Sequence, residues 1–117
     1  MSAKRVSAAL PALSVLSLLA TAMPAGAEDD YPIFVIHMSN GVISPAVVEV
    51  PANTRFKLEL HNDGSSPVEF ESLPLRKEKV LAPGAESFIV IRNLAPGNYA
   101  FFDDFHLDMP PARLIAR

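Results

Sequence analysis

The chain has 117 residues, contains no cysteine and carries a formal net charge of −3. The lack of cysteine excludes disulfides and every form of thiolate chemistry, so the fold must depend on apolar packing alone. An acidic chain without a basic stripe cannot neutralise phosphates, and we therefore expect no nucleic-acid partner.

The first 27 residues have the three-part pattern of a secretory signal peptide. Lys4 and Arg5 form a positive start, and Val6–Ala20 is an apolar, uncharged segment. Ala25-Gly26-Ala27 supplies the small residues of a cleavage site. The apolar run is shorter than the roughly 20 residues needed to span a bilayer, which argues against a retained membrane anchor. We expect cleavage after Ala27 and export to the periplasm, and since two basic residues are then lost, the net charge falls from −3 to −5.

Residues 28–117 show the two-residue alternation of β-strands. In Thr54–His61, Phe56, Leu58 and Leu60 alternate with polar residues, so one face of the strand is apolar and the other charged. The other predicted strands, separated by turns rich in Gly, Pro and Asn, are Tyr31–Met38, Val47–Val50, Val68–Ser72, Lys77–Leu81, Ser87–Asn93, Tyr99–Asp103 and Arg113–Ala116. Short strands at this spacing, without an amphipathic helix between them, predict a single all-β sandwich domain over residues 28–117.

Several segments, in their order along the chain, resemble those of the cupredoxin family. Residues 43–54 resemble the second cupredoxin strand and the turn after it, and Phe56–Asn62 resembles the third strand, which ends in Asn. Residues 94–102 resemble the Pro-Gly turn and aromatic strand that lead into the cupredoxin metal loop. The resemblance covers residues 31–117 and implies a cupredoxin-like Greek-key β-sandwich of seven to eight strands.

The loop after the aromatic strand departs from the blue-copper pattern. In a blue-copper cupredoxin this strand is followed by Cys, His and Met, and a first His follows a Pro after the third strand. The matching loop positions here are Asp103, His106 and Met109, and the first-His position, directly after Pro67, is Val68. Because a blue-copper centre needs a thiolate, this chain cannot form one.

Val68–Ser72 and Phe101–His106 are most similar to the cupredoxin-like periplasmic components of bacterial iron-uptake systems. That resemblance implies a domain that binds Fe(II) or Fe(III) and assists its oxidation or its transfer to a membrane permease. Other periplasmic iron-uptake components are then expected partners. No catalytic constellation is visible in the sequence, so enzymatic iron oxidation stays an open question.

The candidate metal ligands are Asp103, His106, Met109, Glu69 and Glu71. Carboxylates favour hard cations, imidazole suits iron, copper or zinc, and a thioether mainly suits copper. The mixed set therefore leaves the metal open between iron and copper. Glu69 and Glu71 share one face of their predicted strand, and the cupredoxin arrangement implies that this strand lies beside the loop.

Each of these ligands also has a simpler interpretation, which for Met109, directly before Pro110 and Pro111, is a place in the core. Asp103 fits a solvated turn closed by side-chain hydrogen bonds, and His106 fits a packed or surface imidazole. Glu69 and Glu71 fit outward-facing carboxylates of an acidic protein. These interpretations are compatible with the same predicted strands and require no bound metal ion.

Two further functions remain open. One is a periplasmic copper carrier, for which Met109 and Met38 are the informative residues. The other is a metal-free interaction domain that uses the sandwich as a docking surface. In all three cases His37 and His61 are interpreted as surface residues without a ligand role.

Overall fold

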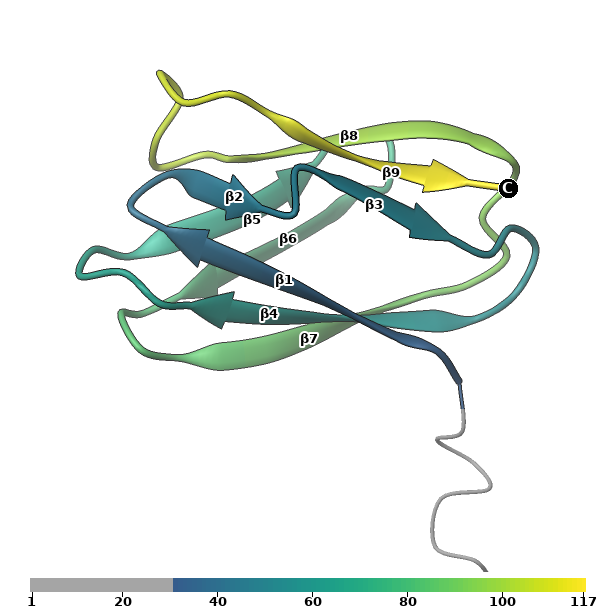
Figure 1. Ribbon diagram of the computed structural model, residues 1–117, viewed down its shortest axis with the longest axis horizontal. Helices are drawn as coiled ribbons and strands as arrows, with labels where there is room; N and C mark the ends of the chain where they lie inside the picture. Colours follow the sequence, from purple (N-terminus) through teal and green to yellow (C-terminus); the bar gives the residue numbers. More distant parts are fainter. Residues whose placement is uncertain (1–30) are drawn as a thin grey trace, which may run out of the picture.

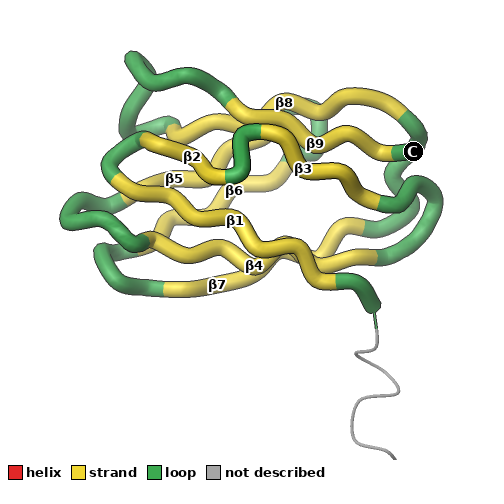
Figure 2. The backbone as a smooth tube through the Cα atoms, in the orientation of Figure 1, coloured by secondary structure: helices red, strands yellow, loops and turns green. Residues whose placement is uncertain are grey.

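The computed structural model describes residues 31–117, which form nine strands and no helix (Figures 1 and 2). No helix within these residues is long and apolar enough to cross a membrane. The predicted signal peptide, residues 1–27, lies outside the described part of the chain. The strands are β1 (Ile33–Ser39), β2 (Val42–Ser44), β3 (Val47–Val50), β4 (Phe56–Asn62), β5 (Val68–Ser72), β6 (Lys77–Leu81), β7 (Glu86–Ile91), β8 (Gly97–Asp103) and β9 (Ala112–Ala116).

The strands form two sheets that pack face to face. One sheet has the order β2-β1-β4-β7, and the other has the order β3-β9-β8-β5-β6. β1 pairs with β4, and β3 with β9, in parallel, while the other pairs are antiparallel. This arrangement confirms the predicted all-β sandwich, with one strand more than the seven to eight expected.

The core between the sheets is made of alternate strand residues. In β4, Phe56, Leu58 and Leu60 are fully buried, as the alternation predicts. Phe70 of β5 and Phe101 of β8 stack with their ring centroids 4.9 Å apart. Each fully buried Leu or Phe side chain contributes about 1.5–3 kcal/mol through apolar burial. This burial stabilises the domain without disulfides.

The predicted bounds of β3, β5 and β6 agree with the structure, whereas β2 is missing from the prediction. Asn40 and Gly41 join β1 to β2 with φ angles of 48° and 90°. Positive φ at both central residues is what a type I′ turn of a two-residue hairpin requires, and Asn-Gly is its preferred sequence. The hairpin escaped prediction because β2 has only three residues and ends directly before Pro45.

β4 ends in a buried amide that fixes the loop leading to β5. The Nδ2 atom of Asn62 donates to the carbonyls of Ser66 and Leu81 at 2.9 and 3.1 Å. Its Oδ1 atom accepts from the N–H of Gly64 at 3.0 Å. With these bonds the β4–β5 loop lies at the same end of the sandwich as the β1–β2 turn and the β8–β9 loop, on the left in Figure 1.

Asn62→Ala is expected to lower the free energy of unfolding by about 2–4 kcal/mol, because it leaves buried backbone groups without a partner. Asn98→Ala is the matched control, since Asn98 lies exposed on β8 and its change should stay within about 0.5 kcal/mol. Urea denaturation of both variants measures the difference. Equal stabilities for the two variants would contradict this account of the loop.

Candidate metal centre

β8 ends in a buried carboxylate that accepts three hydrogen bonds. Asp103 is only 2% exposed, and it faces the interior because Phe101, two residues earlier, belongs to the core. Its Oδ1 atom accepts from the backbone N–H groups of Glu69 and Phe105, each at 3.0 Å. Its Oδ2 atom lies 2.7 Å from Nδ1 of His106. Since a buried charge is tolerated only when it is paired and hydrogen-bonded, these bonds explain how a carboxylate fits here.

The loop after β8 places His106 against Asp103, and it brings both His106 and Met109 close to Gly41. The loop backbone turns twice, with the N–H of His106 bonded to the carbonyl of Asp103 and the N–H of Met109 to that of His106, both at 3.1 Å. The second ring nitrogen of His106, Nε2, lies 3.3 Å from the Ser66 hydroxyl. A Cβ atom at Gly41 would come within 2.6 Å of Met109 Cγ and 2.7 Å of His106 Cβ, so only glycine permits this approach.

Three carboxylates lie close together on the outer face of β5 and the end of β8. Glu69 and Glu71 point outward because their neighbours Val68 and Phe70 are buried in the core. Asp104 follows Asp103 and is exposed, and its N–H donates to the carbonyl of Glu69 at 2.9 Å. One oxygen from each of Glu69, Glu71 and Asp104 lies within 4.8 Å of the others. We refer to these three residues as the acidic cluster.

The pKa of the Glu69 carboxyl lies above its ordinary value. Burial raises the pKa of its carboxyl, and the charges of Asp104, Glu71 and Glu78 raise it further. The ionised cluster is therefore destabilising by itself, and a cation bound among its oxygens would remove the repulsion.

The structure groups the predicted ligands in two places. Asp103 and His106 are in direct contact, and the backbone N–H of Met109 donates to the carbonyl of His106. Glu69 and Glu71 form the acidic cluster with Asp104, and Glu69 reaches Asp103 only through its backbone N–H. That these residues bind metal stays a prediction.

Asp104 was missing from the predicted ligands. Successive strand residues point to opposite faces, so a carboxylate directly after the inward-facing Asp103 falls on the outward face with Glu69 and Glu71. That alternation was the available signal. Met38, which the copper-carrier alternative invoked, is fully buried in the core.

The copper site of a blue-copper cupredoxin does not fit these residues. Val68, at the first-His position, is fully buried and apolar, and the chain has no cysteine. Both oxygens of Asp103, at the cysteine position, already accept hydrogen bonds within the protein. We therefore derive no copper electron-transfer chemistry for this chain.

Glu69→Gln is expected to raise the free energy of unfolding of the metal-free protein at pH 7, by less than about 1 kcal/mol because the side chain is partly exposed. The pKa of Glu69 is higher in the folded state than the ordinary value of 4.5, so the folded state loses stability as the pH rises through that interval. The gain from the variant should be complete above the folded-state pKa and vanish below about pH 4.5. Urea denaturation across this pH range measures it.

Glu49→Gln is the control for that prediction. The Arg117 guanidinium, which donates a hydrogen bond to Glu49 and attracts its charge, lowers the pKa of that carboxyl. Removing the Glu49 charge should therefore leave stability at pH 7 unchanged or slightly lower, the opposite sign to Glu69→Gln. An equal rise in both variants would reflect the net charge of the chain and contradict a local effect at the acidic cluster.

Several solved structures share this fold. A purple cupredoxin from Nitrosopumilus maritimus has a TM-score of 0.55 at 19% identity, and the match covers 71% of this chain and 98% of that one. A copper-binding protein in its apo form has a TM-score of 0.64 at 15% identity, with 74% and 88% covered. The metal-binding domain of the Cu(I)-exporting P-type ATPase of Streptococcus pneumoniae D39, solved with Cu(I), has a TM-score of 0.63 at 14% identity, with 73% and 84% covered. At these identities the likeness shows the fold alone.

A curated relative is closer in sequence. It is the uncharacterized protein RP394 of Rickettsia prowazekii (strain Madrid E), and it is 42% identical over 71 residues. The match covers 61% of this chain and 57% of the relative, so it spans little more than half of the relative's length. The family model of the cupredoxin-like domain matches residues 10–116. Because that match extends over most of the sequence, the chain belongs to the cupredoxin-like domain family.

Proposed function

We propose that this protein binds a metal ion at the acidic cluster and carries it outside the cytoplasm. The observation that carries the proposal is the convergence of the Glu69, Glu71 and Asp104 oxygens within 4.8 Å of one another. The loop next to them is the one that resembles the cupredoxin metal loop. The raised pKa of Glu69 supports it, since the cluster is repulsive without a cation. The copper-binding protein and the Cu(I)-exporting ATPase domain with the same fold also support a metal-binding role.

The ligand atoms indicate the class of cation. An all-carboxylate set favours hard cations and leaves water in the remaining coordination positions. Iron, as Fe(II) or Fe(III), is the cargo that the resemblance to bacterial iron-uptake components implies, and a membrane permease is then the expected recipient. Because Asp104 is exposed, a recipient protein could reach an ion bound at the cluster.

In this proposal Asp103 and His106 are positioning residues. Asp103 accepts from the N–H of Glu69 and directly precedes Asp104, so it holds β5 and the end of β8 at the spacing that the cluster needs. His106 in turn bonds to the other oxygen of Asp103. Loss of either residue is expected to loosen the cluster without removing a ligand.

A copper carrier is the second candidate, and one observation favours it. Met109 and His106 both approach Gly41, and a thioether with an imidazole is a donor pair that suits copper. A copper ion bound there would have to replace the hydrogen bond of His106 Nδ1 to Asp103 or of Nε2 to Ser66. The two candidates therefore differ both in the metal and in the residues that bind it.

Glu69→Gln and Asp104→Asn are each expected to weaken Fe(II) binding tenfold or more, because each removes a charged ligand, and about 1.4 kcal/mol corresponds to one decade in affinity. Anaerobic calorimetry with Fe(II), and a parallel titration with Cu(I), measure the effect. Glu49→Gln is the control of equal charge and should bind like the unmodified protein, since Glu49 lies on β3, away from the cluster, and pairs with Arg117.

Two results would contradict this assignment. Fe(II) affinity unchanged in both Glu69→Gln and Asp104→Asn would remove the acidic cluster from the account. Loss of Cu(I) binding in Met109→Ala and His106→Ala, with no Fe(II) binding by any form, would assign the function to the second candidate.

Export is the remaining part of the proposal, and intact mass tests it. Protein recovered from the periplasm of a Gram-negative host should begin at Glu28, because Ala25-Gly26-Ala27 is the expected cleavage site. A recovered mass that still includes residues 1–27, or recovery from the cytoplasm alone, would contradict it.

A further inference from the structure

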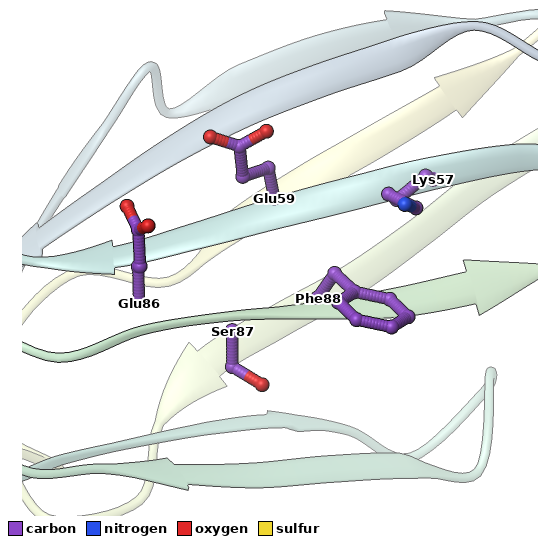
Figure 3. Close-up of a pocket in the computed structure, with 5 residues that line it drawn as sticks. All are labelled: Lys57, Glu59, Glu86, Ser87 and Phe88. Carbon is purple, nitrogen blue, oxygen red and sulfur yellow. The ribbon is translucent and has the colours of Figure 1, made fainter. Parts of the chain in front are cut away.

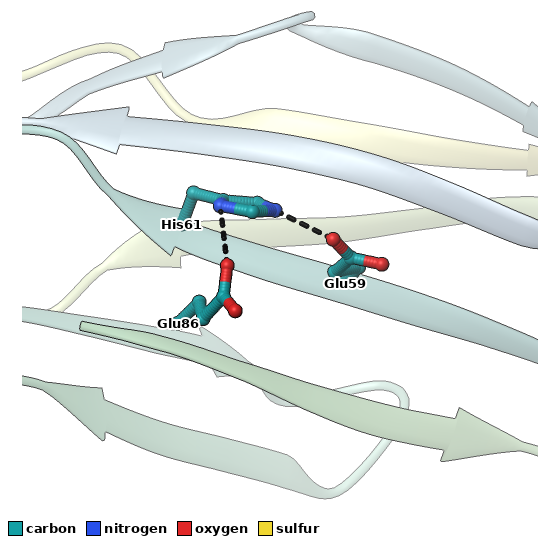
Figure 4. A group of neighbouring side chains, drawn as sticks. All are labelled: Glu59, His61 and Glu86. Atoms are coloured by element: carbon teal, nitrogen blue, oxygen red, sulfur yellow. Dashed lines mark hydrogen bonds and ion pairs between the residues drawn. The ribbon is translucent and has the colours of Figure 1, made fainter. Parts of the chain in front are cut away.

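A second group of ligating side chains lies on the outer face of the other sheet. Glu59 and His61 of β4 are two residues apart and point outward. The residues that alternate with them, Leu58 and Leu60, are buried in the core. Glu86, the first residue of β7, is the antiparallel partner of His61. Figure 4 shows the imidazole of His61 between the two carboxylates. These three residues belong to strands that take no part in the acidic cluster.

Both ring nitrogens of His61 face carboxylate oxygens. Nε2 lies 2.8 Å from Oε1 of Glu59, and Nδ1 lies 3.2 Å from Oε2 of Glu86. A neutral imidazole carries one N–H, so it can donate to only one of the two carboxylates, and its other nitrogen presents a lone pair. The second contact is attractive only when a positive species, either another proton or a metal ion, lies between nitrogen and oxygen. This arrangement is unlike a surface histidine with solvent on both sides.

The ring is held in place by a second imidazole. His37 of β1 is the parallel partner of His61, and the two rings stack with centroids 5.0 Å apart and planes inclined by 27°. Nδ1 of His37 lies 2.6 Å from Oδ2 of Asp63, which holds His37 over the His61 ring. The His61 side chain is consequently only 22% exposed, although it stands on an outer sheet face. A prearranged ring of this kind lowers the entropy cost of binding an ion.

A nearby ammonium group is directed away from the carboxylates. Glu59 and Glu86 line a surface pocket with Lys57, Ser87 and Phe88, and their carboxylates lie at one end of it (Figure 3). Lys57 places its Nζ atom over the ring of Phe88, 4.4 Å from the centroid, at the other end. The end of the pocket beside His61 therefore combines negative charge with an imidazole.

We propose that Glu59, His61 and Glu86 form a second metal site, for a divalent cation of intermediate hardness such as Zn(II). One ligand atom from each residue already lies within 4.8 Å of the others. Two atoms bound to one zinc ion lie at most about 4.2 Å apart, because each Zn–N or Zn–O bond is about 2.1 Å. The side chain of Glu86 is 70% exposed and can move the remaining distance.

The chain has three histidines, which makes the test direct. Long-range ¹H–¹⁵N spectra of the ring nitrogens are recorded at constant pH during a titration of the purified protein with ZnCl2, and His61→Ala assigns the His61 signals. One His61 nitrogen should shift strongly on the binding of one equivalent, while His106→Ala should leave that shift unchanged. In calorimetry, His61→Ala and Glu86→Gln should each weaken binding of this equivalent tenfold or more.

Controls separate this site from the acidic cluster. Glu49→Gln, with the same charge change on β3, should keep full Zn(II) affinity at His61. Zinc binding that is lost in Glu69→Gln and Asp104→Asn but kept in Glu86→Gln would overturn this inference and leave the proposed function standing. His61 signals that respond to pH but not to ZnCl2 would overturn it as well, since a proton alone would then occupy the second contact. Glu86→Gln keeps the test valid if His61→Ala does not fold, because Glu86 is exposed.

Discussion

The buried carboxylate of Asp103 is the constraint on which the rest of the candidate site depends. A charge in the interior of a sandwich is tolerated only with full hydrogen bonding, and here two backbone N–H groups and one imidazole provide it. Those bonds join β5, the end of β8 and the following loop. They determine where Asp104 and His106 lie, because both residues belong to that loop.

Because side chains alternate along a strand, each sheet has an inner face of apolar residues that form the core and an outer face that carries the possible metal ligands. In β5 the period puts Val68 and Phe70 in the core and Glu69 outward. In β4 it puts Leu60 in the core and His61 outward. The acidic cluster and the His61 group therefore arise in the same way on different sheets. A change in strand register by one residue would remove both and would also expose the core.

The strands were largely predictable from the sequence because burial leaves a period in it, and β5 was found with its observed bounds. Contacts between strands were not, because they depend on pairing and register. Nothing along the chain indicates that His61 of β4 lies opposite Glu86 of β7 and beside His37 of β1. The sequence therefore indicates only a surface position for His61. The pairing of Asp103 with His106 was accessible, because the resemblance placed both residues in one loop.

A metal ion at the acidic cluster would give this family member a function without a cysteine and without the blue-copper geometry. The most direct test of that claim is anomalous diffraction from crystals grown with Mn(II), a hard cation whose ligand preferences match carboxylates. We expect an anomalous peak on the outer face of β5 and β8, in contact with Glu69, Glu71 and Asp104. A peak bound by His106 and Met109 alone would contradict a metal site at the acidic cluster. The absence of any peak at the cluster in these crystals would contradict it as well.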